Sequence, residues 1–492
     1  MSLRPRYRTI YEINTLVWLF ELGEKTGCSV NLGSVPSSEW DRIAGYGFDA
    51  VWLMGVWQRS PASIAMANRD DSLLDEFRRS LADFQPQDNI GSAYSVRRYD
   101  VDQRLGASEG LAAARGELAK RGIRLILDFV PNHLALDHPW VTEHPEYFIQ
   151  GNPQDAKDDP QSFVEVNGKV FACGRDPYFP AWQDALQLNA FHPELRQATV
   201  ETVANIAGQC DGVRCDMAML LLNSIFARTW GSRAGLKPTT EYWADLIAAV
   251  KKSSPEFLFI AEAYWNREWE LQQQGFDYCY DKRLYDHLIH GNTAEVRSHL
   301  CADIEYQAKL LRFIENHDEQ RAAAAFPFPK ERAAAVAMAT LPGARLFHEG
   351  QLPGRQIRVP VFLRRRAAEP VNQPIQDFYS KLLQVIDAPA FREGKWSLCH
   401  CTGWPDNSSY QNLLAWSWMS ENDGYLIVIN FSDSPAQGRV QAVGSEIREK
   451  IWRLLDRFSS ESYERDGGEM LDPGLYVDLL PWGYHFFRFE NL

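Results

Sequence analysis

Short apolar runs that end abruptly in acidic or polar side chains recur along the chain. The clearest is FIENHD at 313–318, and the same pattern is seen in LILDFVPNH at 125–133, VRCD at 213–216 and LFIAE at 258–262. A continuous apolar run of this length is typical of a strand buried on both faces. Because parallel barrel strands end at one common face, these four runs predict a single site there.

Strands and helices alternate along most of the chain. Amphipathic or Ala-rich segments predict helices at 37–46, 108–120, 193–207 and 242–251. Apolar runs predict eight strands, at 9–20, 48–57, 123–130, 212–216, 257–262, 276–280, 311–315 and 344–349. Eight strands that alternate with helices, joined by mostly short links, predict an α/β fold of the (β/α)8 TIM-barrel type.

Two regions depart from this alternation. Residues 134–188 are rich in Gly, Asn, Pro and Asp, and a structureless loop of that length is improbable, so an inserted B subdomain after strand 3 is expected. Beyond residue 385, short apolar runs separated by turns such as SDSP and DGGE predict a C-terminal antiparallel β-sandwich. The predicted domains are therefore a barrel at 1–133 and 189–385, the inserted subdomain at 134–188, and the sandwich at 386–492.

The composition of the chain argues against several classes of binding partner. The formal net charge of −14 over 492 residues argues against nucleic acid and against an anionic membrane surface. No apolar run reaches the roughly 18 residues of a membrane span. A neutral substrate fits this charge balance better than an anionic one. Aromatic residues make up 12% of the chain, which is consistent either with a large aromatic core or with rings that stack on sugars.

The N-terminus and the cysteines indicate a compartment. The first segment is basic and then apolar, but Glu12 and Asn14 interrupt it, so it is interpreted as a first strand and not as a secretion signal. The eight cysteines are scattered. Cys399 and Cys401 flank His400, yet one short cluster without a partner cluster is a weak metal signal, and ordinary residues are expected there. The expected location is the cytoplasm.

Three acids, Asp216, Glu262 and Asp318, each stand at a predicted strand end. Cleavage of an acetal needs a carboxylate on one side of the ring carbon and a carboxylic acid at the leaving oxygen. Arg214 lies on the same strand face as Asp216 and is expected to keep it ionised, and His133 and His317 add donors suited to sugar hydroxyls. Strand ends are often polar only because they meet solvent, but four such clusters together favour a site.

The segments DFVPNH (128–133), GVRCDMAML (212–220), FIAEAYW (259–265) and FIENHD (313–318) resemble, in order, the four characteristic segments of the α-amylase family, glycoside hydrolase family 13. The long insertion after the third strand is similar to the B domain of that family. The resemblance implies that Asp216 is the nucleophile, Glu262 the general acid/base and Asp318 the transition-state stabiliser. It also implies substrate contacts in subsite −1 from four residues, namely Tyr94, His133, Arg214 and His317.

The resemblance implies a glycosidase, more specifically a retaining α-glycoside hydrolase that acts on α-linked gluco-oligosaccharides or polysaccharides. An α-transglycosidase that transfers glucosyl or maltosyl units with the same residues is the first alternative, and a non-catalytic carbohydrate-binding protein is the second. Met219 and Leu220 depart from the pattern, because many amylases carry a Lys-His pair there that contacts the leaving-group sugar. No cofactor is required, and no metal ligand is assigned; calcium stays open, since Asn132 matches a frequent ligand position of the family.

Overall fold

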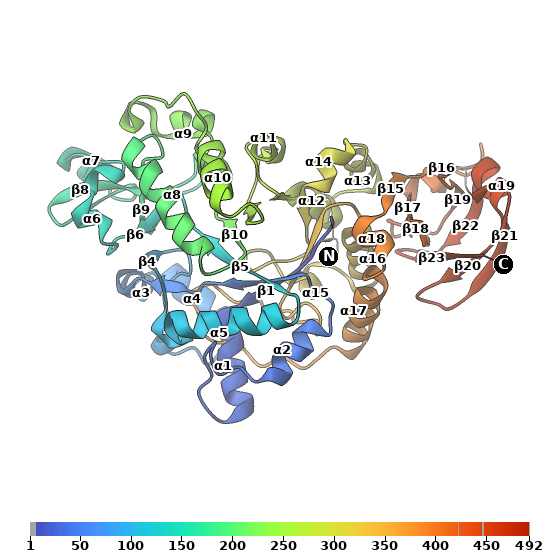
Figure 1. Ribbon diagram of the computed structural model, residues 1–492, viewed down its shortest axis with the longest axis horizontal. Coiled ribbons are helices and arrows are strands. Elements are labelled where there is room, and N and C mark those ends of the chain that lie inside the picture. Colours follow the sequence, from blue (N-terminus) through green and yellow to red (C-terminus); the bar gives the residue numbers. More distant parts are fainter. Residues whose placement is uncertain (1–5, 422, 445–446, 492) are drawn as a thin grey trace. The chain divides into compact units, whose positions relative to one another are not determined.

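The computed structural model describes residues 6–421, 423–444 and 447–491 (Figure 1). Eight strands close into a barrel in the order β1-β14-β13-β12-β11-β10-β5-β2, which confirms the predicted architecture. Their bounds are β1 (Thr9–Asn14), β2 (Ala50–Met54), β5 (Arg124–Phe129), β10 (Gly212–Cys215), β11 (Leu258–Ala261), β12 (Tyr278–Tyr280), β13 (Leu310–Arg312) and β14 (Ala344–His348). Each strand overlaps one of the predicted apolar runs.

The first predicted strand, 9–20, is too long. The strand β1 ends at Asn14, and the helix α1 (Thr15–Thr26) begins at the next residue. The Asn14 side chain accepts a hydrogen bond from the Val17 N–H, as a helix N-cap does. The apolar residues after Asn14 therefore bury one face of a helix, because capping at a single polar residue changes the local backbone conformation.

The chain forms two compact units. The first comprises Tyr11–Tyr280 and Ile357–Ala368, and the second comprises Met1–Ile10, Asp281–Gln356 and Glu369–Leu492. The three domains expected from the sequence have different boundaries, and they stay a prediction. Among the described residues, no helix is both long and apolar enough to cross a membrane.

In the first unit, β2, β5, β10, β11 and β12 pair in parallel with their neighbours. The helices that follow these strands bury one apolar face each. In α10, for example, Trp243, Leu246 and Val250 are spaced by three or four residues and are fully buried. The longer helices of this unit are α2 (Ser37–Ala44), α3 (Pro61–Ala67), α4 (Asp71–Ser80), α5 (Ala107–Lys120), α8 (Pro193–Ala207), α9 (Asn223–Trp230) and α10 (Tyr242–Ser253).

The expected insertion after the third barrel strand carries its own small sheet (Figure 1). Four strands pair antiparallel in the order β6-β9-β8-β7. Their bounds are β6 (His133–Ala135), β7 (Phe163–Val166), β8 (Lys169–Gly174) and β9 (Trp182–Gln187), with the short helices α6 (Trp140–Glu143) and α7 (Pro153–Asp158) between β6 and β7. The pairing of His133 with Gln187 holds the start of the insertion against its end.

The second unit contains β13, β14 and the start of β1, together with a set of C-terminal strands. Its main helices are α12 (Lys282–His290), α13 (Thr293–Leu300), α16 (Phe328–Thr340) and α17 (Gln373–Ile386). The Ala-rich helix α16 is buried over most of its length, and the indole N–H groups of Trp416 and Trp418 donate to Thr340 at its end. These bonds tie the helix to the C-terminal sheet.

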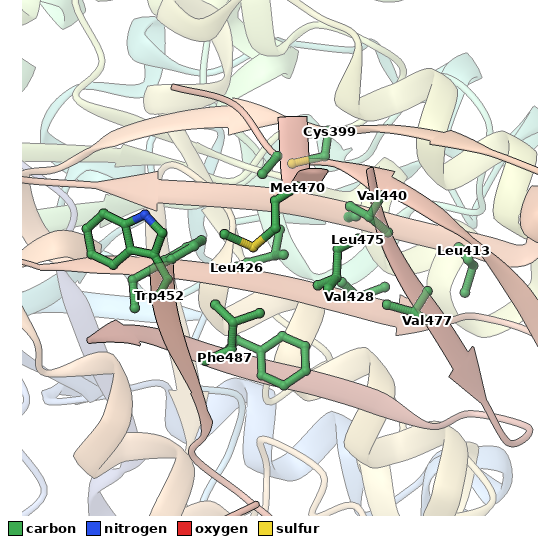
Figure 2. Close-up of a cluster of buried hydrophobic side chains, with 14 of the residues drawn as sticks. Cys399, Leu413, Leu426, Val428, Val440, Trp452, Met470, Leu475, Val477 and Phe487 are labelled. Carbon is green, nitrogen blue, oxygen red and sulfur yellow. The ribbon is translucent and has the colours of Figure 1, made fainter. Parts of the chain in front are cut away.

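Two antiparallel sheets form the C-terminal part, as predicted. The six-stranded sheet has the order β15-β17-β18-β23-β20-β21, and the three-stranded sheet has the order β16-β19-β22. Side chains from both sheets, among them Val428, Phe487 and Val477, pack into one apolar cluster (Figure 2). The bounds are β15 (Lys395–Leu398), β16 (His400–Thr402), β17 (Leu413–Met419), β18 (Gly424–Asn430), β19 (Ala436–Gln441), β20 (Ile451–Asp456), β21 (Ser462–Asp466), β22 (Leu475–Leu479) and β23 (Tyr484–Asn491).

Candidate active site

The ends of β10 and β11 bring two of the predicted acids together. The strands run in register, with Cys215 opposite Ala261, so Asp216 and Glu262 are the next residues of each strand. The Glu262 N–H donates to the Cys215 carbonyl at 3.0 Å. Close approach of the strands depends on Gly212, where a Cβ atom would lie 2.7 Å from the Leu258 Cβ. The backbone therefore fixes the two carboxylates side by side.

Arg214 contacts both carboxylates. Its Nη1 donates to Asp216 Oδ1 at 2.7 Å, and its Nη2 forms an ion pair with Glu262 Oε2 at 2.8 Å. All three residues are buried. A planar guanidinium presents its donors in a rigid fork, so it sets the distance between the two acids as well as their charge.

Three aromatic rings surround this guanidinium. The rings of Trp52, Tyr94 and Tyr280 lie 5.3, 5.2 and 5.6 Å from its central carbon. Burial by itself disfavours the charged form, but the charges of Glu262, Tyr280, Tyr94 and Asp216 prevail and raise the pKa of Arg214 well above its ordinary value. The site therefore holds a permanent cation between its two acids.

Two further groups that the sequence did not single out hold Glu262. Met217 has a left-handed backbone (φ 44°), and its N–H donates to Glu262 Oε2 at 2.6 Å. The Tyr264 hydroxyl donates to Glu262 Oε1 at 2.8 Å. Tyr264 lies inside the FIAEAYW segment, so its position in that motif was the available signal. The backbone contact from Met217 carries no sequence signal, because any residue supplies an N–H.

Asp128 anchors the predicted stacking residue. Tyr94 is half-buried, and its hydroxyl lies 3.5 Å from Asp128 Oδ1. Asp128 also accepts from the Trp52 indole at 3.1 Å and from the Gly55 N–H at 2.8 Å. A single buried carboxylate thus positions two of the rings that surround Arg214, a role that its place within DFVPNH did not indicate.

His133 is buried beside the insertion. Its ring lies 4.9 Å from that of Trp182, and burial, opposed by the charge of Asp184, lowers the pKa of His133 to about 4. The imidazole is therefore neutral near pH 7 and offers one donor and one acceptor. Asn132 Nδ2 lies 3.3 Å from His133 Nδ1, which orients the ring.

In the second unit, FIENHD ends in a turn that separates its polar side chains. Asn316 Oδ1 accepts from the backbone N–H groups of Asp318 and Glu319, both at 2.9 Å. His317 is buried and pairs with Asp318 through Nε2 and Oδ2 at 3.0 Å, whereas the Asp318 side chain is 44% exposed. Asp318 therefore presents a carboxylate at the surface of this unit, steadied by an imidazole.

The two positions at which many amylases carry a Lys-His pair are buried in this chain. Met219 and Leu220 belong to the short 3-10 helix Ala218–Leu221 and are buried, with 0% and 2% of their surface exposed. Aromatic residues follow Glu262 in the sequence. Trp265, which follows Tyr264 and has a φ of 60°, packs edge-on against the exposed ring of Tyr178 at 4.9 Å. This pair, Tyr178 and Trp265, is called the aromatic wall below.

The frequent calcium position does not fit a cation. The Gln187 Nε2 amide donates to three oxygens, namely Asn132 Oδ1 at 2.9 Å, Asn132 O at 2.9 Å and Leu188 O at 3.0 Å. Calcium requires six to eight oxygen ligands, and here an N–H donor occupies the centre of the oxygens. Within the described ranges, no group of three or more His, Cys, Asp or Glu residues is placed to hold a metal ion.

Comparison with known proteins gives consistent matches. The family model "Alpha amylase, catalytic domain" matches residues 37–410. The chain is similar to alpha-amylase MalA of Haloarcula japonica, with 24% identity over 415 residues, 80% of this chain and 52% of that protein. It is also similar to an alpha-1,4-glucan:maltose-1-phosphate maltosyltransferase of Bifidobacterium longum, with 25% identity over 46% of this chain and 25% of that protein.

Among solved structures, the fold is similar to maltogenic alpha-amylase AmyB from Thermotoga neapolitana, with a TM-score of 0.70, 17% identity and full coverage of both chains. An alpha-amylase from Lactobacillus plantarum gives a TM-score of 0.67 at 18% identity, over 99% of each chain. The chain spans about half the length of the first curated relatives that it matches. Because the family model covers most of the chain, and because paired acids stand at the strand ends of a closed barrel, the chain belongs to the α-amylase family.

Proposed function

We propose that the protein is a retaining α-glycoside hydrolase acting on α-linked gluco-oligosaccharides or polysaccharides. The observation that carries the proposal is the contact of one guanidinium, that of Arg214, with both Asp216 and Glu262. Retaining enzymes place their two carboxyl groups only about 5–5.5 Å apart. Two carboxylates that contact the same guanidinium, at 2.7 and 2.8 Å, are close in this way.

In the first step, an oxygen of Asp216 attacks the anomeric carbon while Glu262 gives its proton to the leaving oxygen. A glycosyl-enzyme ester forms, and the leaving sugar departs as an alcohol. Arg214 favours the ionised form of Asp216 that attack requires. Because Met217 N–H and Arg214 occupy Glu262 Oε2, the transferable proton belongs on Oε1, next to the Tyr264 hydroxyl, which then accepts instead of donating.

In the second step, Glu262 removes a proton from water, and the water oxygen displaces Asp216 from the anomeric carbon, which restores the α configuration. We assign Asp318 to the substrate hydroxyls as the ring distorts, since its partly exposed carboxylate is steadied by His317. Tyr94, His133 and His317 are assigned to the same sugar. The neutral state of His133 supports this role, because a neutral ring both donates to and accepts from a hydroxyl.

The test is incubation with maltooligosaccharides, followed by measurement of both reducing ends and chain lengths. Hydrolysis creates new reducing ends. Asp216→Asn should lower the rate of their formation by at least three powers of ten, while the circular dichroism spectrum stays unchanged. Near-normal activity of Asp216→Asn would overturn the assignment of the nucleophile. No change on any α-glucan would favour the carbohydrate-binding alternative.

Transglycosylation is the second candidate, and the aromatic wall favours it. Met219 and Leu220 are buried, whereas Tyr178 is exposed and packs against Trp265. We assign these two rings to the acceptor sugar, because rings that stack on an acceptor exclude water from the second step. In the same assay, redistribution of chain lengths without new reducing ends would identify a transferase. Trp265→Ala should then shift the product ratio towards hydrolysis.

We also propose that no metal is needed and that the protein works in the cytoplasm. The Gln187 amide among the oxygens of Asn132 and Leu188 supports the first statement. The second is supported by the eight cysteines, all of which are free thiols, as is usual in a reducing compartment. The substrate is a neutral carbohydrate, and neither nucleic acid nor a membrane surface is proposed as a partner.

A further inference from the structure

A cavity of about 880 Å³ opens in the second unit, and none of the candidate catalytic or substrate-binding residues lines it. Residues from the start of α13, from the segment before β17 and from the turn between β22 and β23 line it, among them Asn292, Arg297, Tyr410, Gln411 and Trp482. A volume of this size is in the range of small-molecule sites. No step of the proposed reaction uses it.

Trp482 is held on the cavity wall in a conformation that bulky residues avoid. Its φ is 55°, in the left-handed region, which is costly for a residue with a large side chain. Its N–H donates to the Ser432 carbonyl at 3.0 Å, and its ring packs edge-on against Phe431 at 5.2 Å. Glycine would adopt this backbone without strain. The presence of tryptophan here therefore indicates that the indole ring has a role that offsets the cost of the backbone conformation.

The cationic side chains at this lining are already bonded to the protein: Lys330 Nζ, 5.3 Å from the Trp482 ring centroid, donates to the Ile289 carbonyl at 2.7 Å. Arg297 directs its Nη2 at the backbone carbonyls of Gln411 and Leu413, at 2.8 and 2.6 Å. The first N–H groups of α13, on Ala294 and Glu295, are already taken by Asn292 Oδ1 at 2.9 and 3.1 Å. Both cations and the helix N-terminus at this cavity are therefore committed to the protein.

The lining also argues against a thiolate-bound metal. Cys399, His400 and Cys401 line the cavity, but among the described residues no group of three or more His, Cys, Asp or Glu side chains is placed to hold a metal ion. What remains is a set of amides and hydroxyls beside aromatic rings. Such a surface suits a neutral molecule with apolar faces and many hydroxyl groups.

We propose that this cavity binds a segment of an α-linked glucan, with Trp482 as the stacking ring and with Tyr410 and Gln411 as hydrogen-bonding partners. The proposal rests on the substrate class of the proposed function. A polymer of identical units offers the same chemistry to a catalytic and a non-catalytic site. A second site raises the overall affinity for a long chain without any new contact at the reacting sugar.

Cys301 makes the proposal directly testable, because it lines the cavity and is exposed, while the similarly exposed Cys28 lies elsewhere in the chain. In the Asp216→Asn background, which keeps the sugar intact, iodoacetamide labelling of both thiols is followed by mass spectrometry with and without maltoheptaose. Maltoheptaose should slow labelling of Cys301 at least threefold and leave Cys28 unchanged. Equal labelling of Cys301 with and without sugar would overturn the proposal.

The matched variants are Trp482→Gly and Trp404→Ala. Glycine keeps the left-handed turn and removes the ring, so Trp482→Gly should abolish the protection of Cys301 and lower adsorption to insoluble starch about tenfold. Trp404 follows β16 and lies outside the cavity lining, where its ring contacts Arg439 and Tyr476. Its replacement should change neither readout. Gln411→Ala removes an exposed amide without touching the turn and should weaken the protection to a smaller degree.

The outcomes separate this inference from the proposed function. If maltoheptaose protects Cys301 but the wild type cleaves no α-glucan, the proposed binding site is supported and the proposed activity is refuted. Normal cleavage of maltoheptaose with no protection of Cys301 would retain the activity and overturn the binding site. Retention of full protection in a folded Trp482→Gly variant would refute the stacking role.

Discussion

Arg214 is the residue on which the two acids depend. Its fork geometry contacts Asp216 and Glu262 at once, and a lysine ammonium is a single point charge that lacks this geometry. Arg214→Lys should therefore lower kcat/KM on maltooligosaccharides by at least a hundredfold. The thermal unfolding midpoint, measured alongside, separates this effect from loss of the fold. A folded lysine variant with near-normal kcat/KM would contradict the bridging role.

Tyr264 acts through Glu262 and is a positioning residue. When Glu262 is ionised, as the second step requires, the Tyr264 hydroxyl donates to Oε1, and a hydrogen bond to a charged group contributes about 1.5–3 kcal/mol. Tyr264→Phe should therefore lower kcat roughly tenfold to a hundredfold, with KM nearly unchanged, and should shift the pH profile of kcat. Tyr463→Phe is the matched control, because Tyr463 donates to Glu461 two residues away in the same manner but in the C-terminal sheet. A drop in KM alone would not fit this role.

Glu331 is a buried acid that the reaction does not use. Its side chain on α16 is 1% exposed, one oxygen accepts from Tyr379 at 3.0 Å, and burial raises the pKa of Glu331 to about 7. In an unfolded chain the value is about 4.3. Between these values the folded state binds more protons than the unfolded state, so the free energy of unfolding falls as the pH rises and levels off above about 7.

Glu331→Gln should remove this pH dependence. At pH 5 the variant and the wild type should unfold in urea with similar free energies, and at pH 8 the variant should be more stable by up to about 3 kcal/mol. The measurement is a pair of urea titrations at each pH. If the wild type and the variant had parallel dependence on pH, the raised pKa of Glu331 would be refuted.

At the scale of elements, the loop after β5 and the strand β9 are joined by the amides of Asn132 and Gln187. Gln187 is 0% exposed and satisfies three backbone or side-chain oxygens. Removal of a buried donor leaves its acceptors unpaired, at a cost of about 1–3 kcal/mol. Gln187→Ala should therefore lower the free energy of unfolding by roughly that amount.

The same contact predicts the response to calcium. Because an amide fills the place among the oxygens, neither a chelator nor added CaCl₂ should shift the thermal unfolding midpoint. Gln150→Ala is the control for Gln187→Ala within the same insertion. The Gln150 amide donates to the Pro145 carbonyl at the exposed surface, so its removal should have little effect on the free energy of unfolding. A midpoint that rises with calcium would contradict this account.

Sequence periodicity was sufficient for the barrel strands but not for every helix. Runs such as 257–261 are apolar throughout, and that pattern is typical of strands covered on both faces. The helices α3 and α4, in the region 58–106, were not predicted, because their apolar residues contact the rest of the first unit only through a few positions such as Ala67 and Phe77.

At the scale of the whole molecule, the order of the four acidic strand ends along the chain predicted the family and the barrel. The prediction of the barrel and the family depends on local residue order, because a buried strand and the polar residue that follows it are adjacent in the sequence. The assignment of Asp216, Glu262, Asp318, Tyr94, His133 and His317 to roles at the sugar stays a prediction that the experiments above address.

Other features were decided only by the tertiary structure. The contact of Arg214 with Glu262, the anchoring of Tyr94 by Asp128, the burial of Met219 and Leu220, and the Gln187 amide at the expected calcium position all join residues that lie on different elements. Periodicity reports which face a residue occupies, but not which distant side chain it meets. The sequence by itself therefore determined the barrel and its acidic strand ends, and the folded chain determined their partners, because contacts between distant segments exist only after the strands have closed.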